Sequence, residues 1–486
     1  MARRIRYLAV FLVLCFTVLF LQLNNIQIRQ SKQLSGPANP RTFLESVAKP
    51  RGDILTAGGV VVAESRKVND PYKYLRVYPE GPLFADITGF DSLIYGVSGL
   101  EYTYNSYLSA HTSAVHNLSQ LLSSHTVTDN VILTVSNRLQ QVAAAALGNR
   151  KGAVVAINPK TGAVLAMYSS PSYNPNLLAS HNEATERAAW ASYNDSPSQP
   201  MLARAYRQIY PPGSTFKMVT SSAVYDHDPS LATTPIPYMT EMPLPDSNKL
   251  LANYDHELCG GTIYTLFEVS CDTGFGTIGL RLGAANLVEQ ADAYGFNKVP
   301  PFDLPAVASQ FPPASSFTQD PPALAYSAIG QQNVRASALQ MALVASAIAN
   351  GGVIMTPHVM AEIRSSDGRL VKVYKPHPWL RATPPSTAAA VKHLMVGVVE
   401  GRLGTAYGIF PASVDAAAKT GTAQNAPGQC CTNWLAAMAP ASNPAVVVVA
   451  VVPFQPGLPS GPTGAAVAGP VVRQVLLSAL KIEGRG

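Results

Sequence analysis

The chain has 486 residues, a length that suggests two or three domains. Hydrophobic residues make up 47% of it and charged residues only 13%, which excludes a disordered chain and a long coiled coil. The formal net charge of +6 is spread thinly along the sequence, without the clustered basic surface that binding to nucleic acid needs.

The N-terminal segment has the composition of a membrane span. Residues Tyr7–Leu23 carry no charge, and a helix of this length covers about 26 Å, close to the thickness of the bilayer's hydrocarbon core. Arg3, Arg4 and Arg6 precede it, which places the N-terminus in the cytoplasm and the rest of the chain outside. The alternative is a cleaved signal peptide, but Gln22–Ile28 lacks a small-x-small cleavage site. We therefore expect a single-pass protein in the cell membrane whose catalytic domain is extracytoplasmic.

After this segment, the residue pattern of the sequence changes at Asn130. Between Pro40 and Ser124 it is irregular, with short β-branched pieces such as Val60-Val61-Val62 separated by turn residues, which predicts a β-rich spacer. The expected organisation is a cytoplasmic tail (1–6), a transmembrane helix (7–23), a β-rich pedestal domain (24–127) and a larger catalytic domain (128–486).

The larger domain is predicted to be α+β, with a mostly antiparallel sheet. A helix at 139–147 precedes two apolar strands at 153–157 and 163–167, and the turn residues Asn158 to Gly162 join these strands in a hairpin. The later elements are a helix at 339–349 that stops at Asn350-Gly351-Gly352, strands at 434–438 and 446–452, and a last helix at about 471–482.

Four cysteines lie outside the apolar N-terminal segment. A zinc site built from His256, Cys259, Cys271 and a later cysteine is one alternative, but its spacing fits no standard ligand pattern. A disulfide or buried thiols fit better. Because Cys430 and Cys431 are adjacent, we expect a disulfide to join one of them to Cys259 or Cys271 rather than to each other. No metal and no cofactor is expected.

The sharpest chemical signal is Pro211-Pro212-Gly213-Ser214 followed by a helical stretch. The prolines and the glycine cannot lie inside a helix, so Ser214 is placed where a helix begins, beside free backbone N–H groups. Lys217 follows three residues later on the same face, where its amine can accept the serine proton if it is neutral. Burial and a second cation would both favour the neutral amine. The similar Ser46-Val47-Ala48-Lys49 lies in the spacer and is a decoy.

Two further elements complete a candidate site. Lys-Thr-Gly occurs at 160–162, as the hairpin turn, and at 419–421, before Thr422 and the strand at Trp434. The second copy can form a sheet edge that presents its backbone and the Lys419 ammonium to an extended peptide. Ser270-Cys271-Asp272 would carry the proton to a leaving amine, whereas Ser365-Ser366-Asp367 and Ser413-Val414-Asp415 lie in a hairpin tip and a loop.

Ser214-x-x-Lys217, then Ser270-Cys271-Asp272, then Lys419-Thr420-Gly421, in this order along the chain, resemble the active site of penicillin-binding proteins and serine β-lactamases. The flanking sequence is similar to that of class B penicillin-binding proteins, especially the penicillin-binding protein A type, at Arg51-Gly52-Asp53-Ile54, Gly99-Leu100-Glu101, Tyr173-Asn174-Pro175-Asn176, Ile329-Gly330-Gln331-Gln332 and Lys419-Thr420-Gly421-Thr422-Ala423-Gln424. The resemblance implies a membrane anchor, a pedestal, and a transpeptidase domain with a five-stranded antiparallel sheet flanked by helices.

In function, the resemblance implies a peptidoglycan D,D-transpeptidase that cross-links stem peptides through a serine acyl-enzyme and is acylated by β-lactams. Ser214 would be the nucleophile, Lys217 the base and Ser270 the proton carrier to the leaving D-alanine. The remaining implied site residues are Lys419, the substrate-binding Asp272, Thr420 and Gly421, and Thr422, whose N–H would share the oxyanion with that of Ser214. The implied partner is a polytopic membrane glycosyltransferase of the shape, elongation, division and sporulation family.

One residue departs from the family pattern. In the family, the second motif, which is Ser270-Cys271-Asp272 here, normally ends in asparagine. Asp272 only accepts hydrogen bonds when it is ionised. It is expected either to pair with Lys217 or Lys419, which would hold that lysine protonated, or to weaken catalysis. Two other functions stay open. The first is a D,D-carboxypeptidase or β-lactamase-like hydrolase, although the class A Glu-x-x-Leu-Asn signature is absent between Ser270 and Lys419. The second is a non-catalytic, penicillin-binding scaffold for the glycosyltransferase.

Overall fold

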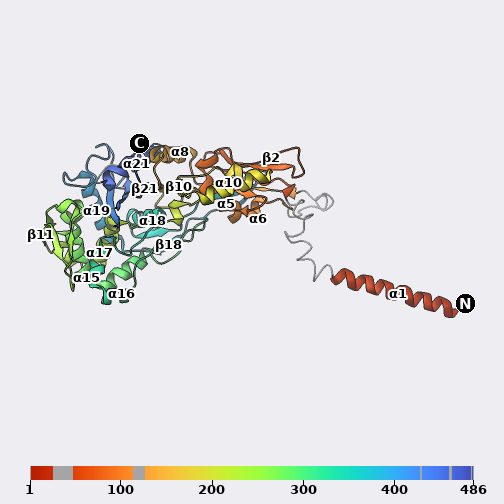
Figure 1. The fold of residues 1–486 in the computed structure, drawn as a ribbon, viewed down its shortest axis with the longest axis horizontal. Helices are drawn as coiled ribbons and strands as arrows, with labels where there is room; N and C mark the ends of the chain where they lie inside the picture. Colours follow the sequence, from red (N-terminus) through yellow and green to blue (C-terminus); the bar gives the residue numbers. More distant parts are fainter. Residues whose placement is uncertain are drawn as a thin grey trace.

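The computed structural model describes residues 2–25, 47–112, 126–426, 429–458, 462–482 and 484. Residues Tyr7–Leu23 lie within the N-terminal helix α1 (Ala2–Asn24), which stands apart from the body of the molecule (Figure 1). Over the part of the chain that the structure describes, no helix is both long enough and apolar enough to cross a membrane.

A five-stranded sheet forms the centre of the larger domain. Its strand order is β10-β9-β21-β20-β19 and every neighbouring pair is antiparallel, so the expected sheet is confirmed. The strands are β9 (Gly152–Ile157), β10 (Val164–Ser170), β19 (Ala417–Ala426), β20 (Gln429–Ala439) and β21 (Val446–Val452). All seven residues of β21 are buried, as its continuous valine-rich sequence predicts for a central strand covered on both faces. β19 is an edge strand.

Helices cover both faces of this sheet. The C-terminal helix α21 (Gly469–Ile482) packs against β20, β21 and α8 (Asn137–Leu147), whereas α18 (Ala338–Ala349) packs against β9 and β21. Figure 1 shows the sheet between these two groups of helices. All of α18 is buried, and the helix ends before Gly351 and Gly352, which have φ of 61° and 85°. This left-handed backbone is why glycines stand at that stop.

A helical subdomain lies beside β19 and supplies the rest of the site. Its main helices are α12 (Lys217–His227), α14 (Ile263–Glu268), α15 (Asp272–Ala293), α17 (Pro321–Ala328) and α19 (Pro385–Glu400). α15 packs against α12 and α17, and α19 packs against α14 and β19. The start of α12, the start of α15 and the edge of the sheet are therefore brought together.

The pedestal is organised around a six-stranded sheet of order β17-β16-β8-β1-β2-β3. Its strands are β1 (Ile54–Leu55), β2 (Val61–Lys67), β3 (Tyr74–Val77), β8 (Asp129–Leu133), β16 (Met360–Ser365) and β17 (Leu370–Val373). β1 and β8 are parallel and the other pairs are antiparallel. The predicted hairpin tip at 365–368 joins β16 to β17, with the Gly368 amide donating to the Ser365 carbonyl. The sheet therefore takes strands from both sides of residue 127.

A buried ion-pair cluster ties the pedestal together. Glu101 is fully buried and accepts hydrogen bonds from Arg76 Nε at 2.6 Å and from Arg51 Nη2 at 2.8 Å. Burial alone would raise the pKa of Glu101, but the two arginines outweigh it and hold the pKa below its ordinary value. This network gives a structural role to Arg51 and Glu101, which belong to the Arg51-Gly52-Asp53-Ile54 and Gly99-Leu100-Glu101 segments noted in the sequence.

The other elements are short or lie outside the two main sheets. They are η2 (Gly81–Leu83), α4 (Ala85–Thr88), β4 (Asp91–Ser92), β5 (Gly96–Val97), α5 (Gly99–Thr103), α6 (Asn105–Leu108), β6 (His111–Thr112), β7 (Thr126–Val127), α9 (Pro175–Leu178), α10 (Glu183–Asp195), α11 (Arg204–Arg207), η3 (Gly213–Phe216), α13 (Ser230–Thr233), β11 (Ile236–Met239), β12 (Glu241–Pro243), β13 (Leu250–Ala252), η4 (Tyr254–His256), β14 (Cys259–Gly261), α16 (Ala314–Gln319), β15 (Val353–Met355), β18 (Pro378–Arg381) and α20 (Gly464–Val467).

Candidate active site

Ser214 lies on a short 3-10 turn, η3, that continues directly into α12. The helix begins here as predicted, because Pro211 and Pro212 precede it and the Thr215 hydroxyl donates to the Pro212 carbonyl at 2.7 Å. Gly213 has a φ of 53°, and its amide donates to the Gly330 carbonyl at 2.9 Å. The turn is therefore fixed from both sides, and Ser214 is 8% exposed within it.

Lys217 is fully buried one turn further along. Its Nζ donates to the Ser270 carbonyl at 2.7 Å and to Asp272 Oδ1 at 2.6 Å, and lies 3.4 Å from Ser270 Oγ. Burial lowers the pKa of Lys217, while the nearby Asp272 carboxylate acts in the opposite direction. Within the described residues, the hydrogen bonds of Lys217 do not include one to Ser214.

Ser270 and Asp272 lie where α14 ends and α15 begins. Ser270 has a φ of 62°, and its hydroxyl accepts a hydrogen bond from Lys419 Nζ at 2.8 Å. Asp272 is the first residue of α15; its side chain is 22% exposed, and Oδ1 accepts a long contact of 3.5 Å from the Ser214 hydroxyl. Of the two pairings expected for Asp272, the structure has the one with Lys217.

Lys419 projects from β19 and is also fully buried. Burial and the charge of Lys217 both depress the pKa of Lys419 well below its ordinary value, against the opposing effect of Asp272. The Ser270 hydroxyl therefore lies between two amines, one in an ion pair and one driven toward its neutral form. This arrangement can pass a proton from one amine to the other.

The edge strand β19 approaches the nucleophile turn so closely that glycine is needed. A Cβ on Gly421 would lie 2.8 Å from the Pro212 carbonyl oxygen and 2.9 Å from Thr215 Cγ2. Thr420 and Thr422 flank this glycine: the Thr422 hydroxyl accepts from the Gly464 amide at 3.0 Å, and the Thr420 hydroxyl lies 2.6 Å from that of Thr405. Thr405 was missed by sequence reasoning, because no local pattern marks it.

The cysteine pairing differs from the expectation. Cys259 bonds to Cys271, whose Cα lies 5.8 Å away, so the predicted bond from one of these two to Cys430 or Cys431 is wrong. β14 carries Cys259 beside the start of α15, whereas Cys430 and Cys431 lie on β20. Cys259 and Cys271, two of the three cysteines in the zinc alternative, are therefore joined in a disulfide.

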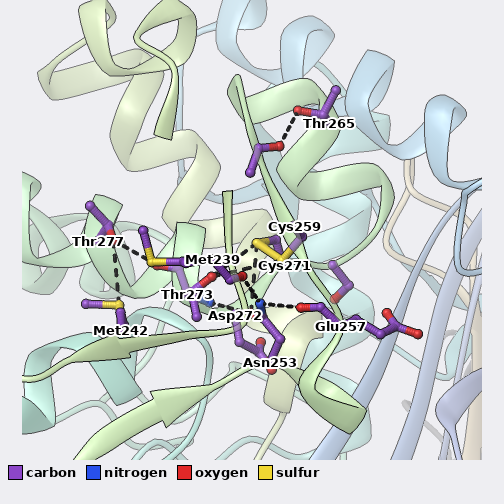
Figure 2. Close-up of a disulfide and its surroundings, with 12 residues drawn as sticks. Met239, Met242, Asn253, Glu257, Cys259, Thr265, Cys271, Asp272, Thr273 and Thr277 are labelled. Carbon is purple, nitrogen blue, oxygen red and sulfur yellow. Dashed lines mark hydrogen bonds between the residues drawn. A yellow bond between two sulfur atoms is a disulfide. The ribbon is translucent and has the colours of Figure 1, made fainter. Parts of the chain in front are cut away.

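Cys271, one half of this disulfide, stands between Ser270 and Asp272 in the sequence. Figure 2 shows it beside Asp272 and Asn253. Asn253 Oδ1 accepts from the Thr273 amide at 2.8 Å, and its Nδ2 donates to the carbonyls of Met239 and Glu257, each at 2.8 Å. The start of α15 is thus attached to the adjoining β-structure by the Cys259–Cys271 disulfide and by the hydrogen bonds of the Asn253 side-chain amide.

The first Lys-Thr-Gly lies away from the site, as expected. Thr161, in the first Lys-Thr-Gly, belongs to the turn between β9 and β10, where the Gly162 amide donates to the Asn158 carbonyl at 2.9 Å. Ser46 lies outside the described residues. Trp434 is fully buried, and its Nε1 donates to the Pro211 carbonyl at 2.9 Å, so it belongs to the core and also supports the nucleophile turn.

Comparison with known proteins agrees with this geometry. Residues 152–477 match the penicillin-binding protein transpeptidase domain, and residues 51–131 match the penicillin-binding protein A dimerisation domain. The peptidoglycan D,D-transpeptidase PbpA of Mycolicibacterium smegmatis is 36% identical over 463 residues, which cover 92% of each chain.

Solved structures give the same result. Penicillin-binding protein A from M. tuberculosis, as its ceftriaxone acyl-enzyme complex, has a TM-score of 0.82 and 33% identity, and covers 90% of this chain and 100% of its own. The D,D-transpeptidase domain of a peptidoglycan glycosyltransferase from Eggerthella lenta has a TM-score of 0.77 and 32% identity, with 90% and 99% covered. The chain belongs to the class B penicillin-binding proteins, in the penicillin-binding protein A group.

Proposed function

We propose that this chain is a peptidoglycan D,D-transpeptidase that joins stem peptides through an ester on Ser214. The observation that carries the proposal is the convergence of three segments on one hydroxyl: Ser270 Oγ lies 3.4 Å from Lys217 Nζ and 2.8 Å from Lys419 Nζ. Ser214, at the start of the same turn as Lys217, contacts the same cluster through Asp272. Named relatives of the same family are D,D-transpeptidases, which supports this reading.

Acylation uses the neutral form of an amine. Ser214 Oγ attacks the carbonyl carbon of the penultimate D-alanine, and its proton passes to Lys217. The backbone N–H groups of Ser214 and Thr422 hold the oxyanion; one such donor is typically worth about 3 kcal/mol. The C–N bond to the terminal D-alanine then breaks, and Ser270 passes a proton to the leaving amine. Burial of Lys217 supports its role as base, because it favours the neutral amine.

Thr420 and Lys419 are assigned to the substrate's terminal carboxylate, and the backbone beside Gly421 to its extended chain. β19 is an edge strand, so its unpaired backbone groups are open to a peptide strand. The amine of a neighbouring stem peptide resolves the ester, which restores the Ser214 hydroxyl and leaves a new amide.

Hydrolysis and scaffolding are the competing functions. The test is to incubate the full chain with a stem peptide ending in D-Ala-D-Ala and a labelled amine acceptor, and to separate products by mass. We expect the amide product to exceed the hydrolysed acid and to vanish in Ser214→Ala. Acid alone would assign a hydrolase. A chain that forms neither product and no Ser214-dependent adduct with fluorescent penicillin would be a scaffold.

The proposal includes a location and a partner. The apolar side chains Val10, Phe11, Val13, Phe16 and Phe20 of α1 are each more than half exposed, so the helix has an apolar surface to bury. We assign residues 1–6 to a cytoplasmic tail, 7–23 to a single-pass anchor, 24–127 to the pedestal and 128–486 to the transpeptidase domain, whose strands β8, β16 and β17 complete the pedestal sheet. Retention of the full chain in carbonate-washed membranes is expected; release by carbonate would overturn the anchor.

A polytopic glycosyltransferase of the shape, elongation, division and sporulation family is the proposed partner, because the transpeptidase needs glycan strands that another enzyme polymerises. The support is by analogy with the family. Co-purification of the full chain with such an enzyme from solubilised membranes tests it, and recovery of the full chain without any glycan polymerase would contradict it.

A further inference from the structure

Thr405 brings a second hydroxyl to the substrate side of β19. It follows α19 in a tight loop and is half-buried, and its Oγ1 lies 2.6 Å from Thr420 Oγ1, where either oxygen can be the donor. The loop is held on both sides. The Thr405 amide donates to the Glu268 carbonyl at 3.2 Å, and the Ala406 amide donates to the Val398 carbonyl at 3.1 Å.

The backbone of this loop leaves little room for movement. Gly404 lies so close to the Val398 carbonyl that an added Cβ would clash with it, and Ala406 is fully buried. The backbone of Thr405 is therefore fixed by the chain on both sides of it. Because Glu268 precedes Ser270 by two residues, the loop also connects the second motif to the edge strand.

The proton count decides what this contact can do. A threonine hydroxyl donates one hydrogen bond and accepts two. If Thr420 donated to Thr405, it would have no proton left for a substrate carboxylate. If Thr405 donates to Thr420, the Thr420 proton remains available for the anion, and its oxygen is held in one position by a second hydrogen bond.

We propose that Thr405 is a positioning residue for the substrate carboxylate: its hydroxyl donates to Thr420 Oγ1 and thereby directs the Thr420 proton toward the anion. The inference rests on the proposed function, in which Thr420 binds that carboxylate. An incoming anion selects the Thr405-to-Thr420 direction, because a hydrogen bond to a charged acceptor is stronger than one between two neutral hydroxyls. Thr405 thus adds to recognition of the chain end without contacting it.

The effect should appear in binding rather than in the acylation step. In Thr405→Val, which keeps the shape of the side chain, we expect the Kd of the complex that precedes acylation by penicillin to rise about tenfold, roughly the contribution of one hydrogen bond to a charged group. The limiting rate of acylation at saturating penicillin should stay within about twofold of the parent, because the reacting atoms are untouched.

Matched variants separate positioning from packing. Thr405→Ser keeps the donor and should restore the parent Kd. Thr161→Val removes the hydroxyl of the other Lys-Thr-Gly threonine and should leave the Kd unchanged. Thr405→Val added to Thr420→Val should cause no further loss, because the two hydroxyls act in series. The methyl ester of penicillin has no anion, so its weak binding should be the same in the parent and in Thr405→Val.

The experiment is stopped-flow acylation of the full chain in detergent over a range of penicillin concentrations, with thermal unfolding measured for each variant. A parent chain that forms no adduct on Ser214 would contradict the proposed function rather than the role of Thr405. If the parent reacts, three results would each overturn the role of Thr405: an unchanged Kd in Thr405→Val, additive losses in the double variant, or an equal loss with the methyl ester. Should Thr405→Val unfold, Thr405→Ala compared with Thr405→Ser gives the same comparison.

Discussion

Asp272→Asn tests whether the Asp272 carboxylate favours the protonated form of Lys217 before acylation. The carboxylate lies 2.6 Å from Lys217 Nζ, and 22% of its side chain is exposed. Two unit charges at this separation attract by about 1.6 kcal/mol in bulk water, and by more where solvent is partly excluded. This attraction favours the protonated form of Lys217, but burial is the larger effect and lowers the pKa of Lys217 on balance.

The sign of the effect follows from the reacting form. Only the neutral amine of Lys217 can accept the Ser214 proton, so acylation rises with pH as Lys217 loses its proton. Without the carboxylate the pKa of Lys217 falls further, and the neutral amine is present at lower pH. We expect the rising part of the acylation profile to move to lower pH. At a fixed pH below it, the rate should rise by about tenfold or more, the factor that corresponds to the lost attraction.

The assay is pseudo-first-order acylation of the full chain by fluorescent penicillin, measured from acid to alkaline pH. Asp367→Asn, which removes a carboxylate at the tip between β16 and β17, is the matched control and should leave the profile in place. A profile that is identical in Asp272→Asn and the parent, or one that moves to higher pH, would refute the assignment of Lys217 as the base restrained by Asp272.

Three other substitutions test the parts that hold the site and the pedestal. Cys259→Ser removes the disulfide to Cys271, which spans 12 residues. It should lower the free energy of unfolding in urea by about 3 kcal/mol and slow acylation. If the variant and the parent were equally stable, the structural role of that disulfide would be contradicted. Gly421→Ala places a Cβ 2.8 Å from the Pro212 oxygen and should slow acylation at least tenfold, whereas Gly58→Ala, which meets no atom within 4 Å, should not; equal rates would argue against the close approach. Glu101→Gln leaves the buried Arg76 and the partly exposed Arg51 without their full counter-charge and should cost about 3–5 kcal/mol in urea unfolding, while the folded fraction acylates at the parent rate; an unchanged midpoint would show that the cluster is not stabilising.

The sequence predicted the elements that depend on local signals. Two prolines and a glycine place the start of a helix at Ser214, and a turn sequence places the hairpin that contains Thr161. The valine-rich run at 446–452 predicts a buried central strand. Each of these rests on residues within a few positions of one another, where backbone sterics and hydrophobic pattern act directly.

What could not be predicted depends on contacts between distant segments. The pairing of Cys259 with Cys271 follows from how β14 meets the start of α15, and the contact of Thr405 with Thr420 from how the loop after α19 meets β19. The same holds for β16, which joins the pedestal sheet from far along the chain. The spacing of residues in the sequence does not predict such packing. For Asp272, spacing alone left both Lys217 and Lys419 as possible partners.

The most direct test of the account is mass spectrometry of the intact full chain after exposure to penicillin, followed by mapping of the modified peptide. The account predicts one added penicillin per chain, on the peptide that contains Ser214, and none in Ser214→Ala. An adduct on another residue, or an unmodified parent chain that is folded by circular dichroism, would contradict it.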